Sequence, residues 1–382
     1  MRTVSAQTRH PDPYRAGLAL GEALAECAPE VVFLFSSIHY GQDADLLEGI
    51  QDALANPQLL VIGNSGDGIY ESGGALDFGA TALGINSEGR AQWQLACASG
   101  VKADPAAATR QAWQRLQQHG RPDWALLVSD FHADASQIEQ VLADEVPIPV
   151  VGGLAADDNR MHDCFLYANR QILRDSMVML GCRGGVAFDI HVGNSLPAVG
   201  SPGRIDEAAG AEVRTIDGLS AMDFIERETG KPVLQSDRGI VSLTVINPEA
   251  PSERTLRSIV PDFSTDTGHL GLYGGIERGK SVQVCLATPA QLLQEVDQIA
   301  RQAAQATFQP QAALIVSCGG RKQMLGPQIG NEISQLTGAF THPLPLAGFP
   351  SFGEIAPLKG PAGFTRNLFH NMTYVVLLLG DQ

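Results

Sequence analysis

The chain has 382 residues, a hydrophobic share of 44% and a formal net charge of −16, with a sequence pI of about 4.9. This length allows two or three domains with sizeable cores. The acidic balance argues against a nucleic-acid partner, because nucleic acids are bound by clustered Lys and Arg.

The cysteines and the hydropathy pattern bear on the compartment. No two of the six cysteines stand in a C-x-x-C spacing, which argues against a zinc ribbon or a redox motif. The N-terminal stretch MRTVSAQTRHPDPYRAG has no apolar signal core, and the late apolar run Tyr374–Leu379 is too short to cross a bilayer. We therefore expect a cytoplasmic protein with reduced cysteines and no membrane association.

The first predicted element is an amphipathic helix over Pro13–Cys27. A βαβ unit is predicted next, from the apolar run Val31–Phe35, the helical stretch Asp43–Ala55 and the apolar run Leu59–Ile62. The loops after the two strands read Ser36-Ser37-Ile38-His39 and Gly63-Asn64-Ser65-Gly66-Asp67-Gly68. Strand patterns through residues 70–98 then predict an antiparallel extension, followed by a helix over residues 105–119.

The same order of elements returns at residues 124–158. Ala125–Val128 is followed by Ser129-Asp130-Phe131-His132, a helical stretch follows, and Ile148–Val151 ends in Gly152-Gly153-Leu154-Ala155-Ala156-Asp157-Asp158. Consecutive strand patterns over residues 163–192 predict an antiparallel or mixed sheet. After a helix predicted over Ser220–Thr229, the polar, turn-rich Lys231–Gly239 marks the predicted domain boundary.

A third unit follows three further strand patterns and a helix capped by Thr288. Ala312–Val316 is followed by Ser317-Cys318-Gly319-Gly320, and Leu344–Ala347 ends at Gly348 in a loop that closes with Gly353-Glu354. Continuous apolar runs are typical of parallel strands that are buried on both faces. We predict an α/β fold: a two-part protein with mixed sheets built from repeated βαβ units plus antiparallel extensions.

Several of these motifs resemble the FIST family, a two-part sensory module named for F-box and intracellular signal transduction proteins. In the first half they are VVFLFSS, LLVIGNSGDGI, VVGGLAADD and Ile216-Asp217-Gly218-x-x-Ala221. In the second half they are Leu256-Arg257, Ser317-Cys318-Gly319-Gly320-Arg321, Ala347-Gly348-Phe349, Gly353-Glu354-Ile355 and Phe369-His370-Asn371-x-Thr373. The first loop, GNSGDGI, departs from the acid-containing G-E-I-like element that is more frequent in the family.

The resemblance implies a lead-in at residues 1–30, a FIST N-like domain at 31–230 and a FIST C-like domain at 231–382. It also implies a cytoplasmic input module for signalling that binds a small ligand, often suggested to be an amino acid. Some family members are haem-binding nitric-oxide sensors, which is the alternative function. Because no output segment is recognised before Gln382, we expect a separate signalling partner such as a histidine kinase or a cyclase.

Ligands of open α/β sheets bind outside the carboxyl ends of the parallel strands. The binding residues predicted there are Ser37, Asn64, Ser65, Asp67, Gly153, Ala155, Asp157, Cys318, Arg321, Gly353, Glu354 and Asn371. Arg321 can clamp a carboxylate with two hydrogen bonds, and Glu354 or Asp67 can accept an ammonium group, which suits an amino-acid zwitterion. The other interpretation of Arg321 and Glu354 is an internal salt bridge.

Two further kinds of chemistry stay open at this point. A haem needs one axial histidine and an apolar pocket, and the candidate ligands are His39, His132, His191 and His370. The sequence contains no H-x-x-x-H or H-E-x-x-H pair, so no dedicated metal site is indicated. Ser, His and Asp are all present at the predicted strand ends, so an uncharacterised hydrolase is the third function, although we expect no catalysis.

Overall fold

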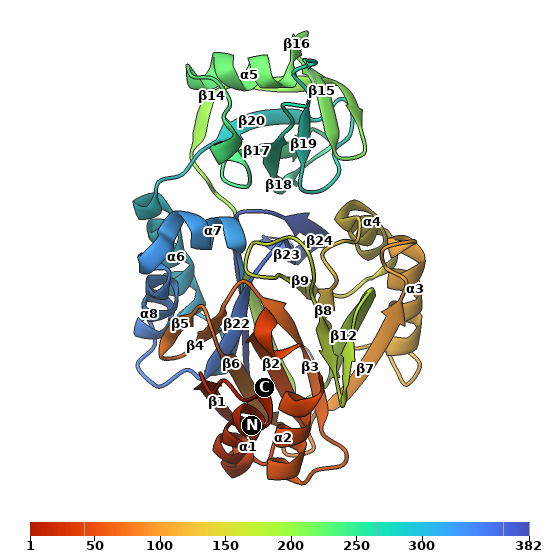
Figure 1. Cartoon of the computed structure of the whole chain (residues 1–382), viewed down its shortest axis with the longest axis vertical. Helices are drawn as coiled ribbons and strands as arrows, with labels where there is room; N and C mark the ends of the chain where they lie inside the picture. Colours follow the sequence, from red (N-terminus) through yellow and green to blue (C-terminus); the bar gives the residue numbers. More distant parts are fainter. Residues whose placement is uncertain (42, 265, 362, 382) are drawn as a thin grey trace.

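The computed structural model describes residues 1–382 apart from residues 42, 265, 362 and 382. It confirms the α/β fold: a body of three six-stranded mixed sheets carries an antiparallel barrel at one end (Figure 1). Residues 194–197 and 286–288 connect the barrel to the body. No helix within the described part of the chain is both long and apolar enough to span a membrane.

The body is built from three repeats with the same order of elements. The first repeat contains β1 (Arg2–Thr8), α1 (Pro13–Leu24), η1 (Ala25–Cys27), β2 (Val31–Ser37), η2 (Ile38–Tyr40), α2 (Asp45–Leu54), β3 (Leu60–Gly66), β4 (Ile69–Glu71), β5 (Gly74–Leu76) and β6 (Ala80–Asn86). The second contains β7 (Gln92–Ser99), α3 (Pro105–Leu116), β8 (Trp124–Ser129), α4 (Ala135–Glu145), β9 (Val150–Leu154), β10 (Leu166–Ala168), β11 (Gln171–Leu173) and β12 (Ser176–Arg183). The third contains β13 (Val186–Gly193), α6 (Pro289–Ala303), β21 (Pro310–Cys318), α7 (Gly319–Leu325), η4 (Gly326–Gln328), α8 (Gly330–Gly338), β22 (Leu346–Ser351), β23 (Glu354–Gly360), β24 (Gly363–His370) and β25 (Tyr374–Asp381).

The barrel interrupts the third repeat between β13 and α6. It contains β14 (Ala198–Ala209), β15 (Glu212–Ile216), β16 (Leu219–Ser220), α5 (Ala221–Thr229), η3 (Gln235–Asp237), β17 (Ser242–Asn247), β18 (Ala250–Pro261), β19 (Leu270–Leu272) and β20 (Ser281–Cys285). Its strands run in the order β14-β20-β17-β18-β19-β15, and pairing of β14 with β15 closes the ring. The predicted boundary after residue 230 does not coincide with these units, because the barrel takes strands from both sides of it.

Each repeat supplies one parallel strand pair, as the apolar runs predicted: β2–β3, β8–β9 and β21–β22. The hairpin that follows each pair joins the sheet of another repeat, so that β4 pairs with β22, β10 with β3, and β23 with β9. The three sheets have the orders β1-β6-β2-β3-β10-β11, β7-β12-β8-β9-β23-β24 and β13-β25-β21-β22-β4-β5. This cyclic exchange makes the body one cooperative unit, since no repeat holds a complete sheet.

Both faces of each sheet are buried, which explains the continuous apolar runs. Phe35, Val128 and Val316 meet in one core that all three sheets share. The neighbouring positions along the same strands face the opposite side, where Leu34 and Leu127 pack under helices. Figure 1 shows the helix pairs α1–α2, α3–α4 and α6–α8 on three sides of the body.

In each repeat, the second apolar run ends at a glycine that is required for steric reasons. Gly63, Gly152 and Gly348 occupy equivalent positions in the three repeats, and each lies directly opposite a residue of its neighbouring parallel strand. A Cβ atom at these residues would lie 1.6, 1.8 and 2.1 Å from a backbone carbonyl oxygen of that strand. Any side chain would therefore force the parallel pair apart, so the glycines are conditions for the pairing rather than turn residues.

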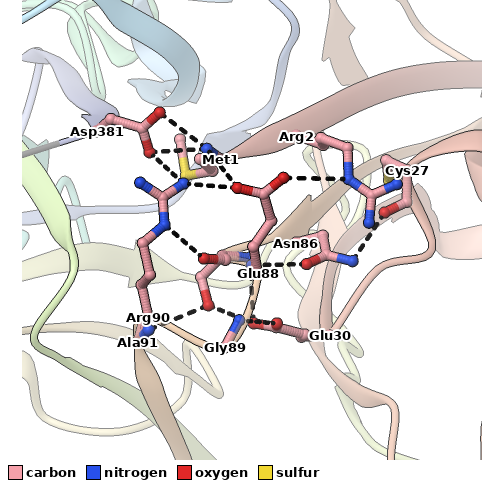
Figure 2. Close-up of polar contacts among 11 residues, drawn as sticks. Met1, Arg2, Cys27, Glu30, Asn86, Glu88, Gly89, Arg90, Ala91 and Asp381 are labelled. Atoms are coloured by element: carbon pink, nitrogen blue, oxygen red, sulfur yellow. Dashed lines mark hydrogen bonds and ion pairs between the residues drawn. The ribbon is translucent and has the colours of Figure 1, made fainter.

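The two ends of the chain are joined at the end of the body that lies away from the barrel (Figures 1 and 2). The α-ammonium group of Met1 donates to the Asp381 carboxylate at 2.7 Å. Arg90 contacts Asp381 at 2.8 Å and Glu88 at 3.0 Å. These partly exposed ion pairs connect the first sheet with the third and leave the barrel end of the body uninvolved.

Candidate ligand-binding cleft

A cleft of about 430 Å³ lies between the barrel and the body, at the carboxyl ends of β21 and β22. The body contributes residues 159–161, 318–320, 323, 351, 352 and 371, and the barrel contributes residues 235, 236, 238, 239, 258 and 273. This is the place where open α/β sheets bind ligands, and a cleft between two units can open and close.

The loop after β9 brings Arg160 to the cleft. Asp157 belongs to this loop and is 1% exposed. Its carboxylate accepts hydrogen bonds from three backbone N–H groups, those of Met161 at 2.8 Å, His162 at 2.6 Å and Asp163 at 3.0 Å. Asp158, Asn159 and Met161 all have positive φ angles, of 64°, 58° and 58°. The carboxylate of Asp157 thus holds a tight loop whose conformation is unfavourable for residues with a side chain, and the loop presents Arg160.

The barrel wall carries the second cation, Arg238. Its Nε donates to the hydroxyl oxygen of Tyr273 at 2.9 Å, and its guanidinium lies 5.9 Å from the centre of the Tyr273 ring. Among the residues that the structure describes, neither Arg160 nor Arg238 forms a salt bridge. Both guanidinium groups are therefore available to an anion.

At the floor of the cleft the barrel is in direct contact with the body. Asn371 accepts a hydrogen bond from the backbone amide of Ser258 at 3.0 Å and donates to the carbonyl of His370 at 3.1 Å. A Cβ atom at Gly320 would lie 2.5 Å from the carbonyl oxygen of Gly239 in the barrel. The glycine at the start of α7 therefore permits the approach of the barrel backbone.

Charges are unevenly distributed around the cleft. Arg160 and Arg238 are its charged lining residues, and no carboxylate lines it in the described part of the chain. A neighbouring cavity of about 670 Å³ shares Asn159 and Gln323 with it. Its described lining residues include the acids Asp67, Asp77 and Asp158 and one cation, Lys322, which lies 2.9 Å from Asp77 and 3.4 Å from Asp67. A cationic cavity thus adjoins an acidic one.

Three predicted site residues lie at these cavities. Cys318 and Asn371 line the cleft, and Asp67 lines the acidic cavity. Burial raises the pKa of the Cys318 thiol well above its ordinary value, and the nearby Glu354 adds to the rise. Cys318 is therefore a neutral thiol, which favours packing over nucleophilic chemistry. Burial also raises the pKa of Asp67.

The other predicted residues lie below the cleft and do not line it. Backbone pairing or internal hydrogen bonds engage seven of them, although the Oδ1 atom of Asn64 has no partner among the described residues. These seven are buried at or near strand ends: Ser37, Asn64, Ser65, Gly153, Ala155, Asp157 and Gly353. Glu354 is fully buried and bonds to Ser351 and Thr373. These residues do stand at or near strand ends, but they are buried and do not line the cleft.

Arg321, expected to clamp a ligand, has no exposed surface. It donates to Glu332 at 2.8 Å and to Glu295 at 2.7 Å, and its guanidinium lies over the ring of Tyr374. Glu295 also accepts the backbone N–H of Ser195, in the first connection to the barrel. The geometry therefore favours an internal ion pair, with two acids that the sequence did not connect to Arg321.

The four candidate haem ligands stand on different elements or loops, and none of them lines the cleft. His39 is exposed beside Phe78, and His132 bonds to Asp130. His191 is buried next to Asp189, and His370 is fully buried with its Nε2 bonded to a carbonyl oxygen. Burial lowers the pKa of His370 to about 3.

Serine, histidine and aspartate do meet at the end of β8, as the hydrolase alternative required. The Ser129 hydroxyl, however, donates to the carbonyl of Asp130 at 3.4 Å rather than to the imidazole of His132. That serine is fully buried. The nucleophile-to-base contact of a catalytic triad is not formed by these residues.

Comparison with known proteins decides the family. Residues 30–219 match the FIST N domain, and residues 221–357 match the FIST C domain. The chain belongs to the FIST family. An uncharacterized protein of Mycobacterium tuberculosis is 26% identical to this FIST protein over 274 residues, which is 68% of each chain. An uncharacterized protein of Methanocaldococcus jannaschii is 31% identical over 93 residues, 24% of this chain and 18% of the relative.

Solved structures add little to this family assignment. Thermotoga maritima PurL complexed with ATP is 13% identical, covers 99% of this FIST protein and 71% of its own chain, and has a TM-score of 0.22. The structure of PurLQS from the same organism has 10% identity, covers 100% and 72% of the two chains, and has the same TM-score of 0.22. These scores are too low to inform fold or function.

Both FIST domains contribute to the cleft. FIST N provides the loop with Arg160, and FIST C provides Arg238, Tyr273 and the ends of β21 and β22. The boundary between the two matches falls inside the barrel, between β16 and α5. Sequence reasoning missed Arg160 and Arg238. The available signal was that each stands in a polar loop, Arg160 after Asn159 and Arg238 between Asp237 and Gly239, which is too common a setting to select them.

Proposed function

We propose that this sensory FIST protein binds a small carboxylate-containing ligand in the cleft between barrel and body. The observation that carries the proposal is the pair of guanidinium groups, Arg160 and Arg238, on a cleft that no acid lines among the described residues, in a chain of net charge −16. Guanidinium groups recognise carboxylates through paired hydrogen bonds. A local cationic site of this kind binds an anion although the overall charge does not steer it there.

We propose further that the ligand is an amino acid. The cationic cleft and the acidic cavity are neighbours that share Asn159 and Gln323 as lining residues. A carboxylate at Arg160 and Arg238 leaves an ammonium group directed toward Asp158, the acid whose loop also carries Arg160. Lys322 already pairs with Asp67 and Asp77, so Asp158 is the acid that can accept the ammonium group.

The response to the ligand is closure of the cleft. Arg238 belongs to the barrel and Arg160 to the body, so one ligand that contacts both binds the closed arrangement more tightly than the open one. Only such a differential affinity shifts the population of the two states. Two short connections and the contacts at Asn371 and Ser258 supply the pivot.

The experiment is thermal unfolding with a panel of amino acids, each compared with the matching carboxylic acid that lacks the amino group. A bound amino acid raises the melting temperature because it binds only the folded state. Arg238→Ala and Arg160→Ala should abolish this rise, and Asp158→Asn should reduce it for the amino acid but not for the carboxylic acid. Arg301→Ala, at an exposed helix position, is the matched control. Unchanged stabilisation in both cleft variants would contradict the proposal.

The haem alternative finds less support in these residues. None of the four candidate histidines lines the cleft, so none of them is placed to serve as an axial ligand there. The contacts of Ser129 likewise give the hydrolase alternative no nucleophile. We therefore propose a binding role without catalysis.

We also propose that the protein acts in the cytoplasm and passes its response to a separate signalling protein, such as a histidine kinase or a cyclase. The support for the compartment is that all six cysteines are free thiols, five of them buried, which suits a reducing environment. The support for the partner is the sensory character of the FIST domains. Co-purification of a kinase or cyclase in a ligand-dependent manner is the test.

A further inference from the structure

One cluster outside the cleft combines three metal-ligating side chains of different kinds. Asp130, His132 and Cys164 bring a carboxylate oxygen, an imidazole nitrogen and a thiol sulfur within 4.8 Å of one another. Asp130 and His132 follow β8, whereas Cys164 precedes β10, so the fold brings the cysteine from a distant segment. None of the three lines the cleft.

The positions of the three side chains are fixed by their surroundings. Asp130 is 1% exposed; one of its oxygens contacts Nδ1 of His132 at 2.7 Å, and the other accepts the backbone N–H of Asp175 at 3.0 Å. The amide of Cys164 donates to Asp163 at 2.9 Å, and its side chain is buried. Only His132 is partly exposed, at 31% of its side chain, so the cluster is open to solvent on one side.

We propose that Asp130, His132 and Cys164 form a binding site for a divalent metal ion of the zinc class. One oxygen, one nitrogen and one sulfur ligand suit a borderline ion, whereas calcium and magnesium take oxygen ligands. Three protein ligands with an open side leave the fourth tetrahedral position to water. Burial and the neighbouring Asp130 raise the pKa of the Cys164 thiol, so binding of the ion has to displace the thiol proton as well as the proton shared between Asp130 and His132.

Lys102 makes the proposal sharper. Its ammonium group lies 3.5 Å from Asp130, and its side chain is 44% exposed. It partly neutralises the negative charge of Asp130, as the metal ion would, and it can move into solvent when the ion binds. Removing this positive charge should therefore strengthen metal binding, an effect that a merely structural Asp130–His132 pair does not predict.

The test uses the full chain, stripped with a chelator and titrated with Co²⁺ as a spectroscopic probe for zinc. We expect a thiolate-to-cobalt charge-transfer band in the near ultraviolet, which Zn²⁺ removes by displacement. Cys164→Ser should abolish the band, and the control Cys97→Ser, at a partly buried thiol outside the cluster, should keep it. His132→Ala should weaken Co²⁺ binding by at least about tenfold, and Lys102→Met should tighten it.

Circular dichroism checks that each variant is folded. If the buried Cys164→Ser does not fold, the partly exposed His132 and Lys102 variants decide the question, because they affect metal binding in opposite directions. Absence of a Co²⁺ band in the unmodified chain, or a band that persists in folded Cys164→Ser, would overturn the proposal.

Discussion

The hydroxyl of Ser351, which lines the cleft, donates a hydrogen bond of 2.7 Å to the carboxyl group of the fully buried Glu354. Thr373 donates to the second oxygen of Glu354 through its amide at 3.1 Å and its hydroxyl at 2.8 Å. Burial raises the pKa of Glu354 to about 7. A group directly beneath the cleft therefore changes its charge near neutral pH.

Replacing Glu354 with Gln should remove a pH dependence of stability. The folded chain holds a proton on Glu354 at pH values between the ordinary pKa of 4.5 and about 7, where the unfolded chain has released it. The free energy of unfolding therefore falls as the pH rises through this window, by about 3 kcal/mol in total. In Glu354→Gln, which can donate to Ser351 and accept from Thr373, that fall should disappear.

Urea unfolding across this pH window, for the unmodified chain and for Glu354→Gln, measures the effect. The difference between the two curves cancels the histidines that titrate in the same range. Parallel curves would mean that Glu354 keeps an ordinary pKa in the folded chain.

Replacing Arg321 with Ala should destabilise the protein without a ligand. The change leaves Glu295 and Glu332 as buried acids without their cation, which costs about 3–5 kcal/mol. The control Arg301→Ala removes an exposed arginine from an ion pair on α6 and should cost less than about 1 kcal/mol. Denaturant unfolding compares the two, and a small effect at Arg321 would contradict the internal ion pair.

The role of Arg321 illustrates what a sequence can and cannot predict here. The strand ends at Ser36, Ser129 and Ser317 were predictable because an apolar run and the polar residues that follow it are local signals. An arginine after a strand fits a ligand clamp and an internal ion pair equally well. The choice depends on Glu295 and Glu332, which approach from other elements, and no local pattern connects them with Arg321.

The exchange of hairpins and the insertion of the barrel were not predictable for the same reason. Pairing of β4 with β22 joins segments that are far apart in the sequence, and short strands of this kind look alike in sequence. Arg160 and Arg238 reach one cleft only because the barrel folds back over the body. The prediction of parallel pairs is confirmed, whereas which strand ends are open to a ligand depends on this long-range packing.

Replacing Gly63 with Ala should disrupt the first parallel pair. The added Cβ would lie 1.6 Å from the carbonyl oxygen of Leu34, a backbone atom that cannot turn aside. We expect a loss of more than about 3 kcal/mol in the free energy of unfolding, or a failure to fold. Gly330→Ala is the matched control, since no atom lies within 4 Å of its added Cβ. This substitution in α8 should stabilise the helix by about 0.5 kcal/mol. Similar stabilities of the two variants would refute the steric explanation.

Two arginines join the barrel to the body, and they should differ greatly in importance. Arg257 of β18 is 4% exposed; it donates to Glu139 of α4 at 2.6 Å and to the carbonyl oxygen of Phe369. Arg366 of β24 contacts Glu253 of β18 at 2.6 Å, but its side chain is 49% exposed. Loss of the buried pair leaves the Glu139 carboxylate without its cation and the carbonyl oxygen of Phe369 without this donor, whereas water replaces an exposed pair.

We therefore expect Arg257→Ala to release the barrel while its own core stays folded. Protease cleavage in the connections 194–197 and 286–288 should become faster, and the amide of Ser258, which bonds to Asn371, should exchange its hydrogen sooner. Arg366→Ala should change the free energy of unfolding by less than about 1 kcal/mol and leave both measurements nearly unchanged. Because Arg257 precedes Ser258, whose amide makes the floor contact with Asn371, Arg257→Ala should also weaken the thermal stabilisation by the ligand. Equal cleavage rates in the two variants would mean that the barrel is held elsewhere, and that the cleft does not close about this contact.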